Sequence, residues 1–371
     1  MSVIIFFIIL IVLVLAHEFG HFSAAKGFGI RVDEFGFGFP PKLFGKKFKG
    51  GETEYSVNLL PFGGFVKIYG ENPDEENTSG PDGARSMVNK PKWKQAIVLF
   101  AGVFANFALA WLLFSICLMS GLPASAGSAP DGYKLSDSSL VVMSVLPGSP
   151  AEKAGLAQGD KILSLKSDLP YGRTDVLSEV SPEGLKAFII SHKDDQIKIG
   201  YTNEGVLKEV TVTPAPDIVG GNPGIGISMD EIGVIKLPFF PALWAGLRLD
   251  WSTASATAVG LYNLIANSIA GHGNFSSVAG PVGLVNIVGE AYRFGFVYLL
   301  SFTALISVNL AIINLAPFPA LDGGRLLFLL VEKIKGSRLN PKFANAANMI
   351  GFALIIILML VVTYHDIVRL M

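Results

Sequence analysis

The sequence predicts a polytopic α-helical membrane protein with about four transmembrane helices, a membrane-associated β-hairpin or sheet after the first helix, and an inserted α+β domain. Of its 371 residues, 51% are hydrophobic and only 16% are charged, whereas soluble domains carry about a quarter charged residues. Four stretches lack charge and are long or apolar enough to enter a bilayer. Between the second and third stretches lies a more polar segment with strand and turn patterns.

Composition also excludes several classes of protein. The formal net charge of −1 and the absence of a long basic run argue against a nucleic-acid partner, because phosphate binding needs clustered Lys and Arg. The single cysteine, Cys117, excludes an intrachain disulfide framework. With five histidines in the chain, any histidine-ligated metal site has few possible members.

The first predicted span, residues 1–25, opens with the apolar run 3–16. A signal peptide is the alternative interpretation of this run. However, the leader has no positive charge, and His17 and Glu18 stand where a cleavage site would need small residues. We therefore expect a retained helix that continues to about Ala25.

The other predicted spans cover residues 95–120, 294–321 and 343–365. At about 1.5 Å per residue, some 20 helical residues cross the hydrocarbon layer. A further run without charge, Thr253–Gly271, is rich in Ser, Thr and Asn. We expect it to lie at the membrane interface, as part of a group of interfacial helices over residues 236–290.

Basic residues predict the orientation. The loop 26–94 contains eleven Lys and Arg residues and the loop 317–343 contains five, whereas the flanks 119–139 and 276–296 contain one each. Because basic loops stay in the cytoplasm, both basic loops are predicted to be cytoplasmic. If Thr253–Gly271 does not cross, both termini and the long segment after the second span lie on the opposite side.

That long segment contains an ordered series of local signals. Residues 140–165 read as a strand, a turn, a short Ala-rich helix ended by Gly155, a tight turn at Gly159–Asp160 and another strand. The pattern SPAxxAGLxxGDxI resembles the core of a bacterial PDZ domain. Later strands are expected at Gln196–Thr202, Leu207–Thr213 and Gly224–Ile227, which gives one PDZ-like domain over about 138–230 with a possible peptide ligand.

The motif His17-Glu18-Phe19-Gly20-His21 suggests metal chemistry. Histidines four positions apart lie on one face of a helix, so that both imidazoles can reach one Zn²⁺. Glu18 lies one step around the helix and can take a proton from metal-bound water without being a ligand. The alternative is a chance match or a packed pair of core histidines.

The position of the motif favours the metal interpretation. About 16 helical residues, or ~24 Å of rise, precede His17, and Lys26 follows ~13 Å later. The motif should therefore lie inside the membrane, nearer its cytoplasmic face. Ionisable side chains at this depth cost several kcal/mol each, and a metal cation offers compensation.

The third ligand expected for zinc is Asp322. It follows Pro317 and Pro319, which cannot continue the third span, and unwound backbone at membrane depth is tolerated where it lines a protein cavity. The alternative is that Asp322 caps the next helix, from Gly324 to Leu330.

In combination, these motifs resemble the site-2 protease family of intramembrane zinc metalloproteases, in the branch of the bacterial regulator-of-sigma-E protease. The resemblance rests on HEFGH in the first span, the PDZ-like segment and N-x-x-P-x-P-x-L-D-G in the third span. Shorter matches are Lys90–Trp93, Ala279–Gly283 and Ser307–Asn309. Some members carry two PDZ domains where we find one, and the Gly-Pro usual early in the second span is Gly102-Val103 here, with Asn106 kept.

The resemblance implies His17, His21 and Asp322 as zinc ligands, Glu18 as general base, and Asn314 as a residue that contacts the substrate or the oxyanion. It also implies a role in regulated intramembrane proteolysis in the bacterial cytoplasmic membrane, with the PDZ domain outside the cytoplasm. Expected substrates are single-span membrane proteins such as anti-sigma factors and signal-peptide remnants.

Glycine, aromatic and β-branched residues alternate in the first cytoplasmic loop, in two runs that read as strands. A plain surface hairpin is one interpretation. The family resemblance implies a membrane-embedded sheet whose edge pairs with an extended substrate. The expected substrate-binding residues are Gly36, Phe37, Gly38, Phe39, Gly63, Gly64, Asn314, Pro317 and Pro319. By contrast, Glu71–Asp82 reads as a solvated loop.

The preferred function is a zinc-dependent intramembrane endopeptidase that cuts transmembrane segments of other membrane proteins. One alternative is a membrane-anchored PDZ scaffold with a vestigial metal site. Another is a membrane-bound zinc peptidase that acts on peptides in water, which the apolar helix after His17 disfavours. Nothing near His192, His272 or His365 suggests a second site.

Overall fold

The structure is a computed structural model that describes residues 1–72, 75–126, 135–169, 173–177, 180–203, 205–219, 222–271 and 280–370. The chain forms two compact units. The membrane unit comprises Met1–Cys117 and Phe239–Met371, and the inserted unit comprises Leu118–Pro238. His272, for which no role was expected, lies outside the described residues.

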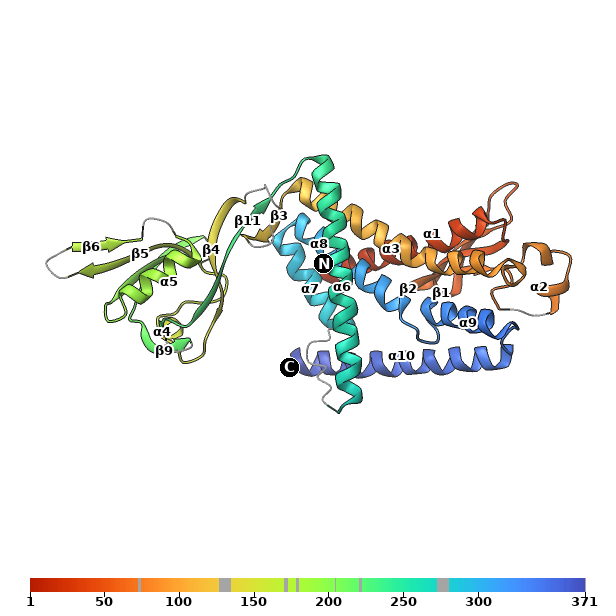
Figure 1. Ribbon diagram of the computed structural model, residues 1–371. Helices are drawn as coiled ribbons and strands as arrows, with labels where there is room; N and C mark the ends of the chain where they lie inside the picture. The colour runs from red at the N-terminus through yellow and green to blue at the C-terminus, as the bar shows by residue number, and fades with distance from the viewer. Residues whose placement is uncertain are drawn as a thin grey trace. The chain divides into compact units, whose positions relative to one another are not determined.

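Within the described residues, four helices are long and apolar enough to cross a membrane. They are α1 (Ser2–Gly27), α3 (Lys92–Ser120), α8 (Phe296–Leu315) and α10 (Pro341–Leu370). Each corresponds to one of the stretches without charge in the sequence, and both chain ends belong to this unit (Figure 1). The fold class is therefore supported as an integral membrane protein with four candidate spans.

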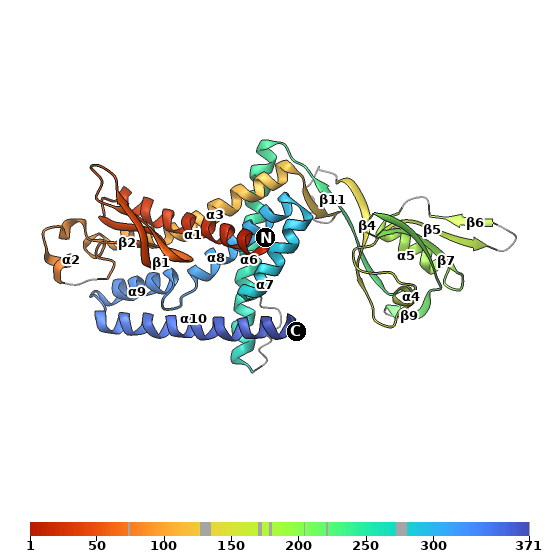
Figure 2. The same cartoon turned by 180° about the vertical axis from the view of Figure 1, so that it is seen from behind.

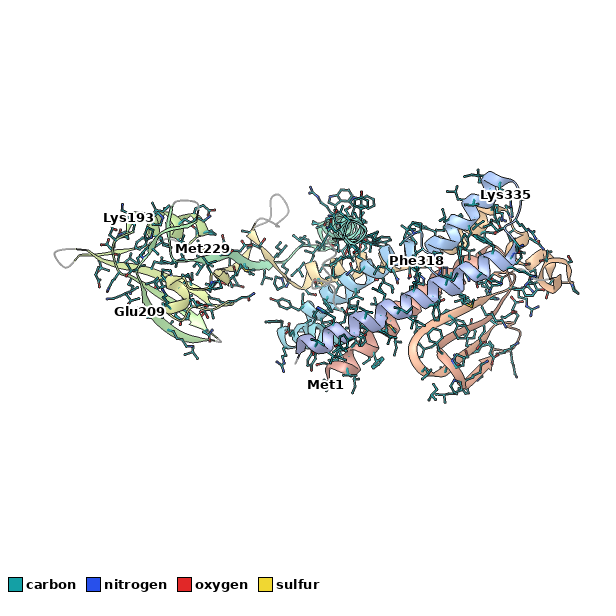
Figure 3. All side chains as sticks on the ribbon, turned by 90° about the horizontal axis from the view of Figure 1, so that it is seen from below. Met1, Lys193, Glu209, Met229, Phe318 and Lys335 are labelled. Carbon is teal, nitrogen blue, oxygen red and sulfur yellow. The ribbon has the colours of Figure 1, made fainter. Side chains whose placement is uncertain are left out.

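The membrane unit also contains the helices α6 (Phe239–Ile269), α7 (Pro281–Phe294) and α9 (Asp322–Lys335). Helix α6, which Figure 3 views along its axis, exposes Phe240, Trp244 and Trp251 by more than 70% each. It contains most of the run expected at the membrane interface and does not qualify as a candidate span.

Small residues let the helices approach each other closely. A Cβ atom at Gly20 of α1 would lie 2.2 Å from the carbonyl oxygen of Ala101 in α3, so only glycine fits at this crossing. Polar side chains join the other helices. The Trp111 indole donates to the carbonyl of Leu243 (2.8 Å), and the Thr257 hydroxyl donates to the Asn309 side chain (2.7 Å).

The third span ends earlier than the sequence predicted. Helix α8 stops at Leu315, and residues 316–321 form a non-helical connection to α9, in which Figure 3 shows Phe318. Proline at position 317 has no amide hydrogen and disfavours helical backbone at Ala316, which explains the stop. The connection folds tightly onto α9, because a Cβ atom at Gly324 would lie 2.2 Å from the carbonyl oxygen of Phe318.

The first loop forms a curled sheet beside α1 from two long strands, β1 (Val32–Lys47) and β2 (Glu54–Ile68) (Figures 1 and 2). Residues 34–37 of β1 pair with 64–67 on one side and with 54–57 on the other, while 42–47 pair with 54–58. The strand runs expected from the sequence are thus present. The segment expected to be a solvated loop differs, because it contains the short helix α2 (Glu75–Ser79).

The inserted unit is built around a sheet with the order β3-β11-β4-β5-β7-β8 and with β6 paired to β5. Helix α5 lies beside the sheet, and β9 and β10 form a separate pair. The sheet strands are β3 (Leu122–Ser125), β4 (Ser136–Val145), β5 (Lys161–Leu169), β6 (Arg173–Val176), β7 (Ile197–Asn203), β8 (Val206–Val212) and β11 (Ile227–Ile235). The other elements are α4 (Pro150–Lys153), α5 (Pro182–Ser191), β9 (Ala215–Val219) and β10 (Asn222–Gly224). The closing strand begins at Ile227 and extends well beyond the predicted Gly224–Ile227.

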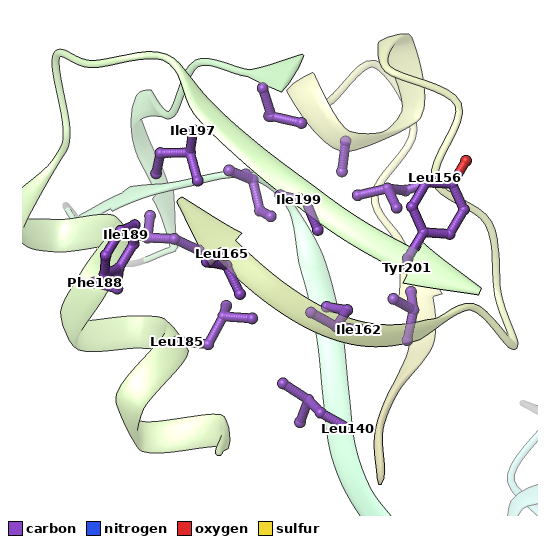
Figure 4. Packing of buried hydrophobic residues seen from close by; sticks show 14 residues of the cluster. Leu140, Leu156, Ile162, Leu165, Leu185, Phe188, Ile189, Ile197, Ile199 and Tyr201 are labelled. Carbon is purple, nitrogen blue, oxygen red and sulfur yellow. The ribbon is translucent and has the colours of Figure 1, made fainter. Parts of the chain in front are cut away.

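Leu185, Phe188 and Ile189 of α5 pack with Leu165 of β5 and Ile199 of β7 to form the apolar core of this unit (Figure 4). The start of α4 follows the capping pattern in the sequence. The Ser149 hydroxyl accepts a hydrogen bond from the amide of Glu152, whose carboxylate accepts one from the amide of Gly148. The local strand-turn-helix order predicted for residues 140–165 is therefore present.

Candidate metal centre

Helix α1 positions the two histidines through its buried face. The buried residues of α1 are Ile9, Leu13, His17, His21 and Ala25, each four positions after the last. This spacing is one stripe of an α-helix, so the histidines replace apolar residues on the most deeply buried face of α1. Both are 8% exposed.

Asp322 reaches the histidines from the first turn of α9. Its Oδ2 atom lies 3.0 Å from Nε2 of His17 and 3.2 Å from Nε2 of His21, and the two Nε2 atoms are 3.2 Å apart. Leu321 occupies the cap position of α9, where no side chain caps the helix. The alternative role of Asp322 as a helix cap is thus wrong, and its carboxylate is available to a ligand.

The donor atoms fit a bound cation. The Nδ1–H of His21 donates to the carbonyl of Val98 (2.8 Å), so the lone pair of His21 is on Nε2. This lone pair faces Nε2 of His17 and the buried Oδ2 atom of Asp322, which has no hydrogen-bond partner. The lone pairs of Nε2 of His21 and of Oδ2 of Asp322 face each other at 3.2 Å, and a cation between them would relieve the repulsion. Tetrahedral zinc with ligands at ~2.0–2.1 Å needs donor atoms about 3.3 Å apart, close to the observed spacing.

Helix α3 supports both histidines from one face. Val98, Gly102 and Asn106 are spaced four residues apart on this helix. A Cβ atom at Gly102 would lie 2.3 Å from Nε2 of His21, so glycine leaves the room that the imidazole occupies. Gly102 therefore lies against the imidazole of His21.

Asn106 contacts the other histidine. Its side-chain amide lies 3.3 Å from Nδ1 of His17, and its Oδ1 atom is buried without a hydrogen-bond partner. When Nε2 of His17 binds a metal, Nδ1 carries the proton and needs an acceptor. If the Asn106 amide is turned by 180°, its Oδ1 atom takes the place of the amide nitrogen and accepts a hydrogen bond from Nδ1–H of His17. The Ser307 hydroxyl of α8 donates to the main-chain carbonyl of Asn106 (2.8 Å), which fixes this part of α3.

Glu18 lies beside the sheet rather than among the three donor atoms. A Cβ atom at Gly64 of β2 would be 3.3 Å from Cγ of Glu18 and 3.0 Å from Cγ1 of Val14. In the register of the sheet, Gly64 lies opposite Phe37, and Gly36 lies opposite Phe65. Three of the expected substrate-binding residues, Gly36, Phe37 and Gly64, therefore lie in the part of the sheet nearest to Glu18.

The other expected substrate-binding residues are more scattered. A Cβ atom at Gly63 would touch the ring of Phe39, and one at Gly38 would lie 2.7 Å from the carbonyl of Leu60. These contacts are within the sheet. Asn314 lies in the last turn of α8, and its side chain makes no hydrogen bond with another described residue. Pro317 and Pro319 lie in the connection that leads to Asp322.

An ion pair that sequence reasoning missed joins the end of the β1–β2 sheet to α9, the helix that begins with Asp322. Arg325, one turn after Asp322 in α9, pairs with Glu71, which follows the end of β2. Helix α10 holds the connection 316–321 between α8 and α9, because the Asn348 side chain accepts a hydrogen bond from the amide of Ala320 (3.1 Å). Motif spacing gives no indication of either contact, because the partners are distant in sequence.

Comparison with known proteins identifies the family of the chain. Residues 5–358 match the model of peptidase family M50. A Clostridium perfringens protein named for zinc metalloprotease activity is 34% identical over 358 residues, covering 96% of this chain and 95% of the relative. The zinc metalloprotease RasP of Geobacillus kaustophilus is 28% identical over 446 residues, with coverage of 99% and 97%. The chain therefore belongs to peptidase family M50, the site-2 protease family of zinc metallopeptidases.

Proposed function

We propose that the protein is an intramembrane endopeptidase that cleaves the transmembrane segments of other membrane proteins. The observation that carries this proposal is the meeting of His17, His21 and Asp322 within 3.2 Å of one another, beside the C-terminal half of the apolar helix α1. A vestigial metal site in a scaffold protein would have no need to keep three potential ligand atoms converged and buried at this cost.

The roles of the residues follow from their positions. His17, His21 and Asp322 would hold zinc, which lowers the pKa of a bound water and polarises the scissile carbonyl. The carboxylate of Glu18 would take the proton from the attacking water and later deliver it to the leaving amine. Asn314 would donate a hydrogen bond to the carbonyl oxygen as negative charge develops there.

The sheet supports binding of an extended substrate. A helical substrate hides its carbonyls in main-chain hydrogen bonds, so cleavage requires local unwinding. Residues 64–67 of β2 pair on one side with 34–37, and no other described strand pairs with them. An unwound substrate segment could add to this edge by β-augmentation, with Gly64 allowing it to approach Glu18.

We infer that the substrates are single-span membrane proteins of the anti-sigma factor or signal-peptide type, cut in regulated intramembrane proteolysis. The sequence motifs shared with the site-2 protease family support this proposal. The bacterial relatives support a location in the bacterial cytoplasmic membrane. The concentration of Lys and Arg in loops 26–94 and 317–343 supports an orientation with the active site toward the cytoplasm and the inserted unit outside.

We also infer that the inserted unit is a PDZ domain with a peptide ligand. An apolar groove of about 240 Å³ lies between α5 and the start of β11, and Ile189, Ile225 and Met229 are among its lining residues. An extended peptide could add to β11 there. Titration of the whole protein with labelled peptides should show binding that Ile190→Asp, at an exposed residue of the groove, removes, and equal binding by the variant would reject this groove.

The test of the main proposal is cleavage of a single-span substrate by the purified protein in proteoliposomes. Glu18→Gln should keep its zinc and lose cleavage by at least a hundredfold, because general-base catalysis contributes about 10²–10⁴. Glu209→Gln, which changes an exposed residue of β8 in the inserted unit, is the matched control. If Glu18→Gln cleaves at the wild-type rate, Glu18 is not the base. If zinc-loaded wild type cleaves no membrane substrate, the scaffold alternative gains support.

A further inference from the structure

The far end of the β1–β2 hairpin combines exposed lysines with exposed apolar side chains. We call residues 42–49 the basic tip. Leu43, Phe44 and Phe48 are each more than 60% exposed, and lysines stand between and beside them at positions 42, 46, 47 and 49. Neither the metal centre nor the part of the sheet near Glu18 uses these residues.

Most lysines of the basic tip lack an acidic partner. Lys42 is neutralised locally, because its Nζ atom lies 3.0 Å from carboxylate oxygens of both Glu34 and Glu54. Among the described residues, Lys46, Lys47 and Lys49 have no carboxylate within 4.0 Å. Three positive charges are therefore available to an external anion.

Two contacts hold the basic tip at the level where α1 leaves the apolar layer. The apolar part of α1 ends at Lys26, whose Nζ atom lies 2.6 Å from a carboxylate oxygen of Glu52, in the turn of the hairpin. Hydrogen bonds from Arg85 and Lys26 hold the pKa of Glu52 below its usual value, so this anchor stays charged. Aromatic rings form the second contact: the ring centroid of Tyr55 lies 5.3 Å from that of Phe48 and 6.2 Å from that of Phe22 in α1.

We propose that the basic tip binds the headgroups of anionic phospholipids. At this level the apolar side chains can enter the boundary between headgroups and acyl chains, while lysines extend their ammonium groups to the phosphates. A nucleic acid or an acidic peptide would match the charge but not the exposed Leu and Phe side chains. This inference does not rest on the proteolytic function.

The experiment measures which lipids surround the basic tip in the full-length protein. A fluorophore is attached to Gly51→Cys, in a Cys117→Ala background, because Gly51 is exposed in the hairpin turn and belongs to neither contact. The protein is placed in phosphatidylcholine vesicles that contain a trace of nitroxide-labelled phosphatidylglycerol or of equally labelled phosphatidylcholine. The ratio of the two quenching efficiencies reports the local enrichment of the anionic lipid.

We expect stronger quenching by phosphatidylglycerol, and we expect 0.5 M salt to weaken this preference because it shortens the Debye length. Each lysine near an anionic surface contributes roughly fivefold to binding, so that Lys46→Gln, Lys47→Gln and Lys49→Gln together should remove the preference. The control removes the same charge from exposed lysines of the inserted unit, with Lys153→Gln, Lys161→Gln and Lys208→Gln.

Several outcomes would overturn the proposal. Equal quenching by the two lipids would do so, as would a preference that survives the triple substitution in the basic tip. Loss of the preference in the control triple variant would indicate a general charge effect instead. Zinc content measured in parallel shows whether the variants are folded. Glu18→Gln should keep the lipid preference, which separates this proposal from the proteolytic one.

Discussion

Gly102 of α3 lies directly against the imidazole of His21, where a Cβ atom would be 2.3 Å from Nε2. This nitrogen points to Asp322. The absence of a side chain at Gly102 in α3 therefore leaves the space in which His21 of α1 can turn toward Asp322. Helix α3 also supplies the carbonyl of Val98, which orients the His21 ring. We therefore expect metal binding at these residues to depend on α3 as much as on the motif in α1.

Gly102→Ala should displace His21 and lower the zinc content of the purified protein by at least tenfold at limiting metal, because contacts around ligands change affinity by about 10–100-fold. Inductively coupled plasma mass spectrometry of the dialysed protein measures the zinc content. Gly260→Ala is the matched control, since a Cβ atom there meets nothing within 4 Å. A Gly102→Ala protein with full zinc occupancy would show that His21 does not need this space.

Asn106→Ala should weaken zinc binding by about 10–100-fold, because Nδ1–H of His17 would lose its acceptor. Asn106→Asp keeps an acceptor oxygen and should recover most of the affinity. Competition with a chelator of known affinity measures both variants. If Asp is no better than Ala at this position, the contact with His17 is structural and does not tune the ligand.

Gly64→Ala should lower cleavage of a membrane substrate without lowering zinc content. The added Cβ atom would lie 3.0 Å from Val14 and 3.3 Å from Glu18, so β2 has to move away from the base by a few tenths of an ångström. We expect a fall in kcat of about tenfold or more, because small misplacements of substrate are costly. Gly260→Ala again serves as the control. Normal turnover in Gly64→Ala would remove β2 from the catalytic account.

Asp366 of α10 caps the start of α7, accepting hydrogen bonds from the amides of Gly280 (3.2 Å) and Gly283 (2.8 Å). Asp366→Ala should lower the free energy of unfolding by ~1 kcal/mol, and Asp366→Asn should lower it less, because an amide oxygen still accepts. Thermal unfolding in detergent measures both. Equal stabilities for the two variants and wild type would show that water replaces the cap.

Much of the site could be predicted from the sequence because its information is local. The four-residue spacing of His17 and His21 defines one helix face, and Pro317 and Pro319 mark where α8 cannot continue. The contribution of Asp322 could be proposed because it follows that break. Its exclusion as a cap required the coordinates, which place Leu321 at the cap position.

The contacts that sequence reasoning missed are between distant segments. Val98, Gly102 and Asn106 do share one face of α3, but an apolar helix does not indicate which neighbour its small residues approach. Asp366 was given no role, because its partners lie more than 80 positions earlier in the chain. The end of α8 was placed too late, because the run without charge continues past the residues that Pro317 prevents from being helical.

The most direct test of the account is the coordination of zinc in the detergent-purified wild-type protein, measured by X-ray absorption together with metal content. We expect one zinc per chain, bound by nitrogen and oxygen at ~2.0–2.1 Å with no sulfur ligand. Asp322→Ala and His21→Ala should each lose most of this zinc. A wild-type protein that takes up no zinc, or variants that keep the wild-type amount, would contradict a metal centre formed by these residues.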